Sequence, residues 1–168
     1  MNMKKLAFLL ILGLIALIST GATRDTYSGS NALATKVSLA DSVDTNGTGI
    51  DLFGYEGALI IANVGAGAVF SDTTVSLELE VEESADNSSF TDVADAHLIG
   101  YVAGTNDGCF GVIDYGDEDQ LVYYASYIGS KRYIRVVCNY VSTGTAPADI
   151  TPVSATVVRM YPKYGPAH

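Results

Sequence analysis

Residues 75–82 (VSLELEVE) carry the feature that most constrains the fold, because apolar and polar residues alternate along them without a break. A period of two is that of a β-strand with one face buried and the other in water. The alternation predicts that the apolar side chains at odd positions face a core. The opposite face of the strand would carry Glu78, Glu80 and Glu82 and would be exposed.

Similar alternation marks residues 132–141 and 153–161. Turn-forming runs such as Asn106-Asp107-Gly108 separate the candidate strands. No capped segment with a helical period follows the N-terminal region. The sequence therefore predicts an all-β fold, an antiparallel β-sandwich, with the jelly roll as one possible form. The shorter candidate strands are residues 35–40, 49–53, 58–64, 98–103, 110–113 and 121–127.

The N-terminus has the composition of a signal peptide. Lys4 and Lys5 precede an apolar run at residues 6–18, and small residues follow up to Ala22. This run is shorter than the roughly 20 residues that a membrane-spanning helix needs. Two alternatives remain open, a cleaved leader and a retained hydrophobic arm. The expected organisation is a leader or arm at residues 1–22, a flexible connection at 23–31 and one β-sandwich domain at 32–168.

The chain is strongly acidic outside this N-terminal segment. Residues 1–22 contain two lysines and no acidic residue, which leaves 7 Lys and Arg against 19 Asp and Glu, a net charge of −12. Binding to nucleic acid depends on Lys and Arg contacts with phosphate, so we expect no nucleic-acid partner. The outer face of a particle or an extracellular setting suits such a charge.

Few residues are available for catalysis. The only histidines are His97 and the terminal His168, so no Ser-His-Asp, Cys-His or histidine metal site is expected. We predict a protein that is not an enzyme and has no cofactor. Clustered carboxylates can bind Ca²⁺, and Asp114, Asp117 and Asp119 form the best candidate site. Their spacing does not match an EF-hand, and a solvated acidic loop explains them better.

Cys109 and Cys138 allow a single intramolecular disulfide. Export would favour the bridge, whereas assembly in the cytoplasm would favour free thiols. Cys138 alternates with Ile134 and Val136, which predicts a side chain in the core.

Two charged groups are candidates for contact with a partner. Glu78, Glu80 and Glu82 would repel one another on one strand face. The densest basic group consists of Lys131, Arg132 and Arg135. One interpretation is an exposed, salt-screened face, and the other is contact with a second subunit through complementary charge. The tyrosines at 123, 124, 127, 133 and 140 suit sheet packing and interfaces, and a sugar-binding surface would use such rings as well.

Two segments resemble a known family. Residues 127–168 contain a glycine followed by a basic and aromatic run, a loop rich in Thr, Gly and Ala, and a last strand with a proline-containing tail (YPKYGP). Residues 77–95 (LELEVEESADNSSFTDVAD) combine a strand, an acidic turn and a Phe-Thr-x-Val element. Together these features resemble small β-rich structural proteins of tailed bacteriophages and prophages, over residues 27–168.

The resemblance implies a virion structural protein that decorates or stabilises the capsid. Its partners would be the major capsid protein or other head subunits, and it would form a homo-oligomer such as a trimer on the capsid exterior. The alternative function is an exported surface or periplasmic β-sandwich that binds a partner such as a glycan. The signal-like leader supports this alternative.

Overall fold

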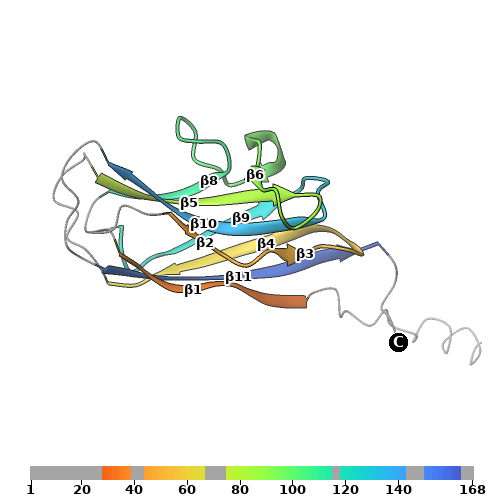
Figure 1. Ribbon diagram of the computed structural model, residues 1–168, viewed down its shortest axis with the longest axis horizontal. Coiled ribbons are helices and arrows are strands. Elements are labelled where there is room, and N and C mark those ends of the chain that lie inside the picture. Colours follow the sequence, from red (N-terminus) through yellow and green to blue (C-terminus); the bar gives the residue numbers. More distant parts are fainter. Residues whose placement is uncertain (1–27, 39–43, 67–74, 115–117, 143–149, 164–168) are drawn as a thin grey trace, which may run out of the picture.

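The computed structural model describes residues 28–38, 44–66, 75–114, 118–142 and 150–163. In these residues the chain forms two antiparallel β-sheets packed face to face, which confirms the predicted all-β sandwich (Figure 1). Among them, no helix is long and apolar enough to cross a membrane. The expected leader or arm at residues 1–22 lies outside the described part of the chain.

One sheet, here called the β4 sheet, has the strand order β1-β11-β4-β9-β7. Its strands are β1 (Ser28–Ser38), β11 (Ile150–Pro162), β4 (Tyr55–Val64), β9 (Val122–Tyr127) and β7 (Leu98–Ile99). The β5 sheet has the order β2-β10-β5-β6, with β3 also pairing β10 and β8 also pairing β5. Its strands are β2 (Thr45–Asn46), β3 (Ile50–Asp51), β10 (Tyr133–Ser142), β5 (Val75–Ser84), β6 (Thr91–Asp92) and β8 (Cys109–Ile113).

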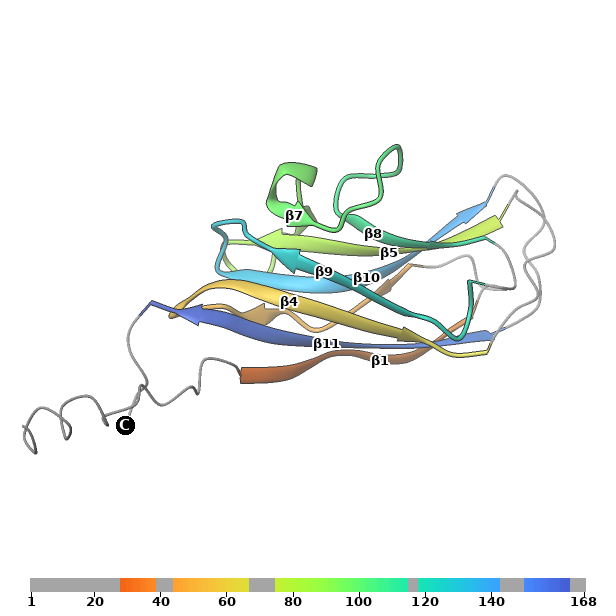
Figure 2. The ribbon, with the colours of Figure 1, turned by 180° about the vertical axis from the view of Figure 1, so that it is seen from behind.

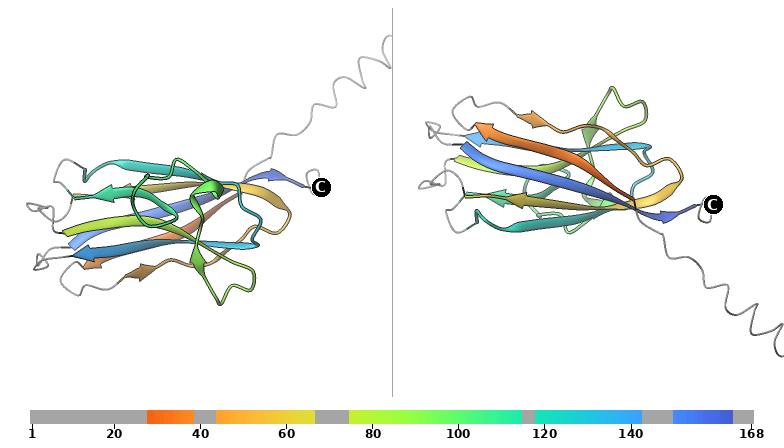
Figure 3. Two further views of the ribbon diagram at one scale, coloured as in Figure 1. Left: turned by 90° about the horizontal axis from the view of Figure 1, so that it is seen from above. Right: turned by 90° about the horizontal axis from the view of Figure 1, so that it is seen from below.

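The connectivity is that of a jelly roll. The first half of the chain pairs antiparallel with the second half: β1 with β11, β2 and β3 with β10, β4 with β9, and β5 with β8. Most consecutive strands lie in opposite layers, since β1, β4, β9 and β11 belong to one sheet and β2, β3, β5, β8 and β10 belong to the other (Figures 1 and 2). Seen from above and below, the strands of both layers run along the long axis of the molecule (Figure 3). A double-sheet roll of this kind is common in viral capsid and lectin domains.

The core lies between the two layers and follows the predicted alternation. On β5, Leu77, Leu79 and Val81 are all fully buried. Val136 on β10 is fully buried opposite Val81. The inward positions of β4 and β11 are buried too, and they carry Ala58, Ile60, Ala62, Val64, Val153, Ala155 and Val157. Burial of these alternating apolar faces is the dominant favourable contribution to folding.

The element boundaries differ from expectation in three places. Residues 28–31, expected in a flexible connection, begin β1 and pair with β11. Only Leu98–Ile99 of the strand expected at 98–103 is extended, because Gly100 has a positive φ of 91° and turns the chain away. The two-residue strands β2 and β6 were not expected, since their pairing depends on long neighbouring strands.

Candidate functional site

Glu78 and Glu80 lie on the outer side of β5, but they are not exposed. Their relative exposures are 8% and 1%, so the prediction of a solvated glutamate face is wrong at these two positions. The loop between β7 and β8 rises above the β5 sheet (Figure 1) and brings Asn106 to both carboxylates. The outer face of β5, which looks solvent-exposed in the sequence, is therefore partly buried and carries polar side chains.

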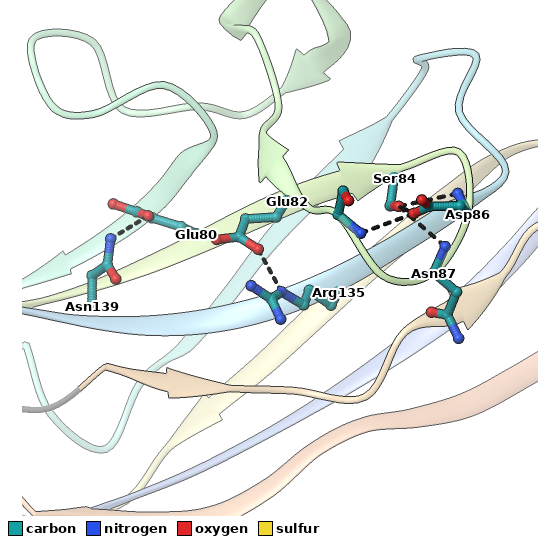
Figure 4. A network of polar contacts seen from close by, with 8 residues as sticks. Glu80, Glu82, Ser84, Asp86, Asn87, Arg135 and Asn139 are labelled. Carbon is teal, nitrogen blue, oxygen red and sulfur yellow. Dashed lines mark hydrogen bonds and ion pairs between the residues drawn. The ribbon is translucent and has the colours of Figure 1, made fainter.

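Three hydrogen bonds satisfy the buried glutamates. The Asn106 amide donates to Glu78 Oε2 at 3.1 Å and to Glu80 Oε1 at 3.2 Å. The Asn139 amide, from β10, donates to the other oxygen of Glu80 (Figure 4). Buried carboxyl groups require such partners, because an unsatisfied polar group costs free energy.

The environment of Glu80 favours its protonated form. Burial is the largest cause and raises its pKa to about 7, while the Asn139 and Asn106 hydrogen bonds oppose the rise. The nearby charge of Asp92 and a hydrogen bond with Glu78 raise the pKa further. Near neutral pH Glu80 is therefore partly protonated.

Glu82, the third residue of the predicted acidic group, pairs within the chain. Its carboxylate contacts the Arg135 guanidinium on the adjacent strand, and the two residues are directly opposite in register (Figure 4). The Arg135 guanidinium also lies 4.4 Å from the centre of the Phe90 ring. The Arg135 side chain is only 22% exposed, so it stabilises the monomer and is poorly placed for a partner.

Arg132 is likewise engaged within the chain. Its Nε and Nη2 donate to the two Asp51 oxygens at 3.1 and 2.8 Å. The guanidinium lies 5.2 Å from the centre of the Phe53 ring and 5.1 Å from that of Tyr133. The hydrogen bond from Arg132 is the main cause that lowers the pKa of Asp51. Lys131 is exposed, so of the three predicted basic residues it is the most available to a partner.

Of the three candidate calcium ligands, the structure describes Asp114 and Asp119. Asp117 lies outside the described residues, and within the described part of the chain no three His, Cys, Asp or Glu side chains gather in a metal-binding arrangement. The Asp114 backbone N–H donates to Glu118 Oε2 at 2.9 Å.

Both cysteines are free and buried. They flank β5, with Cys109 opposite Glu80 and Cys138 opposite Leu79, so two strand spacings of about 4.8 Å separate their backbones. A disulfide requires Cα atoms within about 7 Å, so the bridge that export would have favoured does not form. The predicted core position of Cys138 is confirmed.

An apolar strip lies on the outer side of the β4 sheet. Ile99, Val122 and Tyr124 are 61%, 56% and 69% exposed. Val122 and Tyr124 are alternate residues of β9, and Ile99 lies opposite Ser126, two positions further along. Leu59 and Ile61 of β4 pair with Ser126 and Tyr124 and are half-buried beside them.

Sequence reasoning missed the residues that organise the buried glutamates. Asn106 is part of a run read only as a turn, and Asn139 is a polar residue in an alternating strand. Asp92 and Asp107 were also missed, although each affects the charge around the β5 sheet. These residues share one property, a position beside β5 or β10 in the folded protein. Their spacing along the chain does not reveal that position.

Comparison with known proteins does not assign the chain to a family. No family model matches the chain, and no curated protein matches it. Among solved structures, it is similar to the SPBc2 prophage-derived protein YomS, with 13% identity and a TM-score of 0.36 over 79% of this chain and 92% of that one. It is also similar to the VP2 subviral particle of infectious bursal disease virus, with 16% identity and a TM-score of 0.28 over 84% of this chain and 31% of that one. Neither superposition is close enough to support an inference about function.

Proposed function

We propose that this protein is a non-enzymatic structural component of a phage virion, which decorates or stabilises the head through contacts with neighbouring subunits. The observation that carries the proposal is the exposed apolar strip of Ile99, Val122 and Tyr124 on the β4 sheet. Contiguous exposed apolar side chains on a small domain mark surfaces that bind other proteins. Tyrosine is favoured at such surfaces because its ring is apolar and its hydroxyl can remain hydrated.

Two further features support a role on the outside of a particle. The domain has an excess of acidic residues, which disfavours contact with packaged nucleic acid. Residues 77–95 and 127–168 resemble those of phage structural proteins. Many copies, each with a modest interface, can together add substantial stability to a shell.

The proposal is tested by incorporation into virions. The Tyr124→Glu variant should reduce the copy number per virion, measured by gel densitometry against the major capsid protein, because it places a charge within the apolar strip. Ala85→Glu adds the same charge at an exposed turn and should leave incorporation unchanged. Equal incorporation of both variants would exclude the strip as the contact surface, and absence of the wild-type chain from purified virions would refute the proposed function.

The N-terminus of the purified chain separates this function from the exported alternative. A mass that includes Met1 or Met3, in protein taken from virions, supports a virion component with a retained arm. A mature chain that begins at Thr23 supports an exported binding module.

A further inference from the structure

A pocket of about 420 Å³ opens at one end of the sandwich. It lies between the β3–β4 turn, the β9–β10 connection and the end of β11, at the right-hand end in Figure 1. Its lining includes two aromatic rings and three cationic side chains, those of Phe53, Tyr55, Lys131, Arg132 and Lys163. Phe53 is 71% exposed and presents its ring to solvent at the rim.

The walls of this pocket are held by short hydrogen bonds. The Lys131 backbone N–H donates to the hydroxyl of buried Tyr127 at 2.9 Å, and that hydroxyl donates to Glu83 at 2.6 Å. On the other side, the Lys163 N–H donates to the Gly54 carbonyl at 2.8 Å. A site whose backbone is already fixed loses less entropy when a partner binds.

The charge of the pocket contrasts with that of the chain. Residues 23–168 contain 7 Lys and Arg, and three of them line this pocket. Arg132 is engaged by Asp51, whereas Lys131 and Lys163 are exposed and form no ion pair with a described carboxylate. Glu56 is the one acidic residue of the lining. The pocket therefore presents two available ammonium groups on a protein whose net charge is −10.

An acidic surface, opposite in charge to the pocket, lies over the β5 sheet. Asp92 on β6 and Asp107 in the β7–β8 loop are exposed. The pKa of Asp92 is raised, first by partial burial and then by the charges of Glu82 and Asp107. Arg135 on the same sheet is already paired with Glu82. Within the described part of the chain no cation forms an ion pair with Asp92 or Asp107, so their negative charge is uncompensated there.

We propose that the pocket lined by Lys131 and Lys163 receives the acidic surface around Asp92 and Asp107 of a second copy of this chain. The pocket lies at the end of the sandwich and the acidic surface lies over one of its sheets, so the contact is heterologous. Such head-to-tail contacts generate rings when the rotation closes and open filaments when it does not. This inference rests on the proposed structural function and specifies a polar contact separate from the apolar strip.

Sedimentation velocity of the purified full-length chain provides the test. Association should be evident at about 50 mM NaCl and should weaken at about 500 mM NaCl, because screening shortens the range of charge interactions. Lys131→Glu with Lys163→Glu should weaken association about tenfold or more, since like charges would then meet. Lys131→Arg with Lys163→Arg should preserve it. Glu56→Gln should strengthen it, because Glu56 opposes an acidic partner.

Charge reversal on both surfaces identifies the pairing. Asp92→Lys with Asp107→Lys should also weaken association, and the four changes combined in one chain should restore it. A control combines Lys131→Glu and Lys163→Glu with four lysines at exposed positions of β2, β4 and β11, namely Asn46→Lys, Asn63→Lys, Ser154→Lys and Thr156→Lys. The four added charges restore the net charge without creating a matching surface, so association of this control should remain weakened. Circular dichroism should show the same β signal for every variant.

Three outcomes would overturn the proposal: a monomer at both salt concentrations, unchanged association in the Lys131 and Lys163 double glutamate variant, or equal recovery in the control. If the chain is monomeric at both salt concentrations and the pocket instead binds an acidic glycan or another protein, the proposal is also overturned. Incorporation into virions is measured separately and reports on the proposed function. A monomeric chain that still enters virions would refute the pocket contact alone.

Discussion

The side-chain amide of Asn106 donates a hydrogen bond to Glu80 at 3.2 Å, although the two residues are 26 positions apart in the chain. The same nitrogen donates to Glu78 at 3.1 Å, so one residue of the β7–β8 loop holds both buried carboxyl groups of β5. This contact fixes the loop over the outer face of the β5 sheet. Burial of Glu80 beneath the loop also makes the stability of the domain depend on whether this glutamate is protonated.

Asn106→Ala should destabilise the domain by about 1–3 kcal/mol, because it removes the donor to Glu78 Oε2 and to Glu80 Oε1, and Glu80 then depends on Asn139. Chemical denaturation measures the loss. Gln120→Ala removes an amide from an exposed position and serves as the control, with an expected change within about 0.5 kcal/mol. Equal effects of the two substitutions would show that the bridging contact adds little stability.

Stability should fall as the pH rises from about 4.5 to about 7. Glu80 has an ordinary pKa of 4.5 and a folded-state pKa of about 7, so the folded protein retains a proton that the unfolded chain releases in this window. At about 1.36 kcal/mol per pKa unit, the upper limit of the effect is about 3 kcal/mol. Glu80→Gln should flatten this part of the stability curve, measured by urea denaturation. An identical slope in wild type and variant would assign the effect elsewhere.

Val136→Asp should destabilise the domain by several kcal/mol, because it buries an unpaired charge opposite Val81 in the core. That is enough to unfold a domain of ordinary stability. Thr156→Asp adds the same charge on the exposed side of β11 and should change the melting temperature little. A soluble Val136→Asp variant with an unchanged melting temperature would contradict the observed core.

Arg135→Glu and Lys131→Glu should differ sharply, although both reverse a charge in the same basic segment. Arg135 is partly buried and paired with Glu82, so its reversal should cost about 2 kcal/mol or more. Lys131 is exposed, and its reversal should stay within about 0.5 kcal/mol. Thermal unfolding of the two variants provides the comparison, and similar melting temperatures would argue against a stabilising Arg135–Glu82 pair.

Both thiols should be unreactive in the folded protein and free in the unfolded one. Cys109 and Cys138 are buried, and burial raises the pKa of Cys138 to about 12, so little thiolate forms. A thiol reagent without reductant should modify two cysteines per chain only after denaturant is added. Detection of fewer than two thiols in the denatured chain would indicate a disulfide or an oxidised residue.

Alternation along the chain was sufficient to predict the fold class and the inward faces. Leu77, Leu79, Val136 and Cys138 all face the core as predicted, because the period of two places alternate side chains on opposite sides of a strand. Turn residues marked most strand ends. The jelly-roll form was only one option at that point, since pairing between the two halves of the chain leaves no local signal.

The tertiary structure decided which polar residues are buried and which are available. Glu78 and Glu80 look exposed in sequence, yet the β7–β8 loop covers them and supplies Asn106. Arg132 and Arg135 look like a free basic group, but Asp51 and Glu82 lie close enough to pair with them. Sequence period determines the side of a strand on which a residue lies. Whether that side meets water depends on which distant segment packs over it, and only the folded chain brings those segments together.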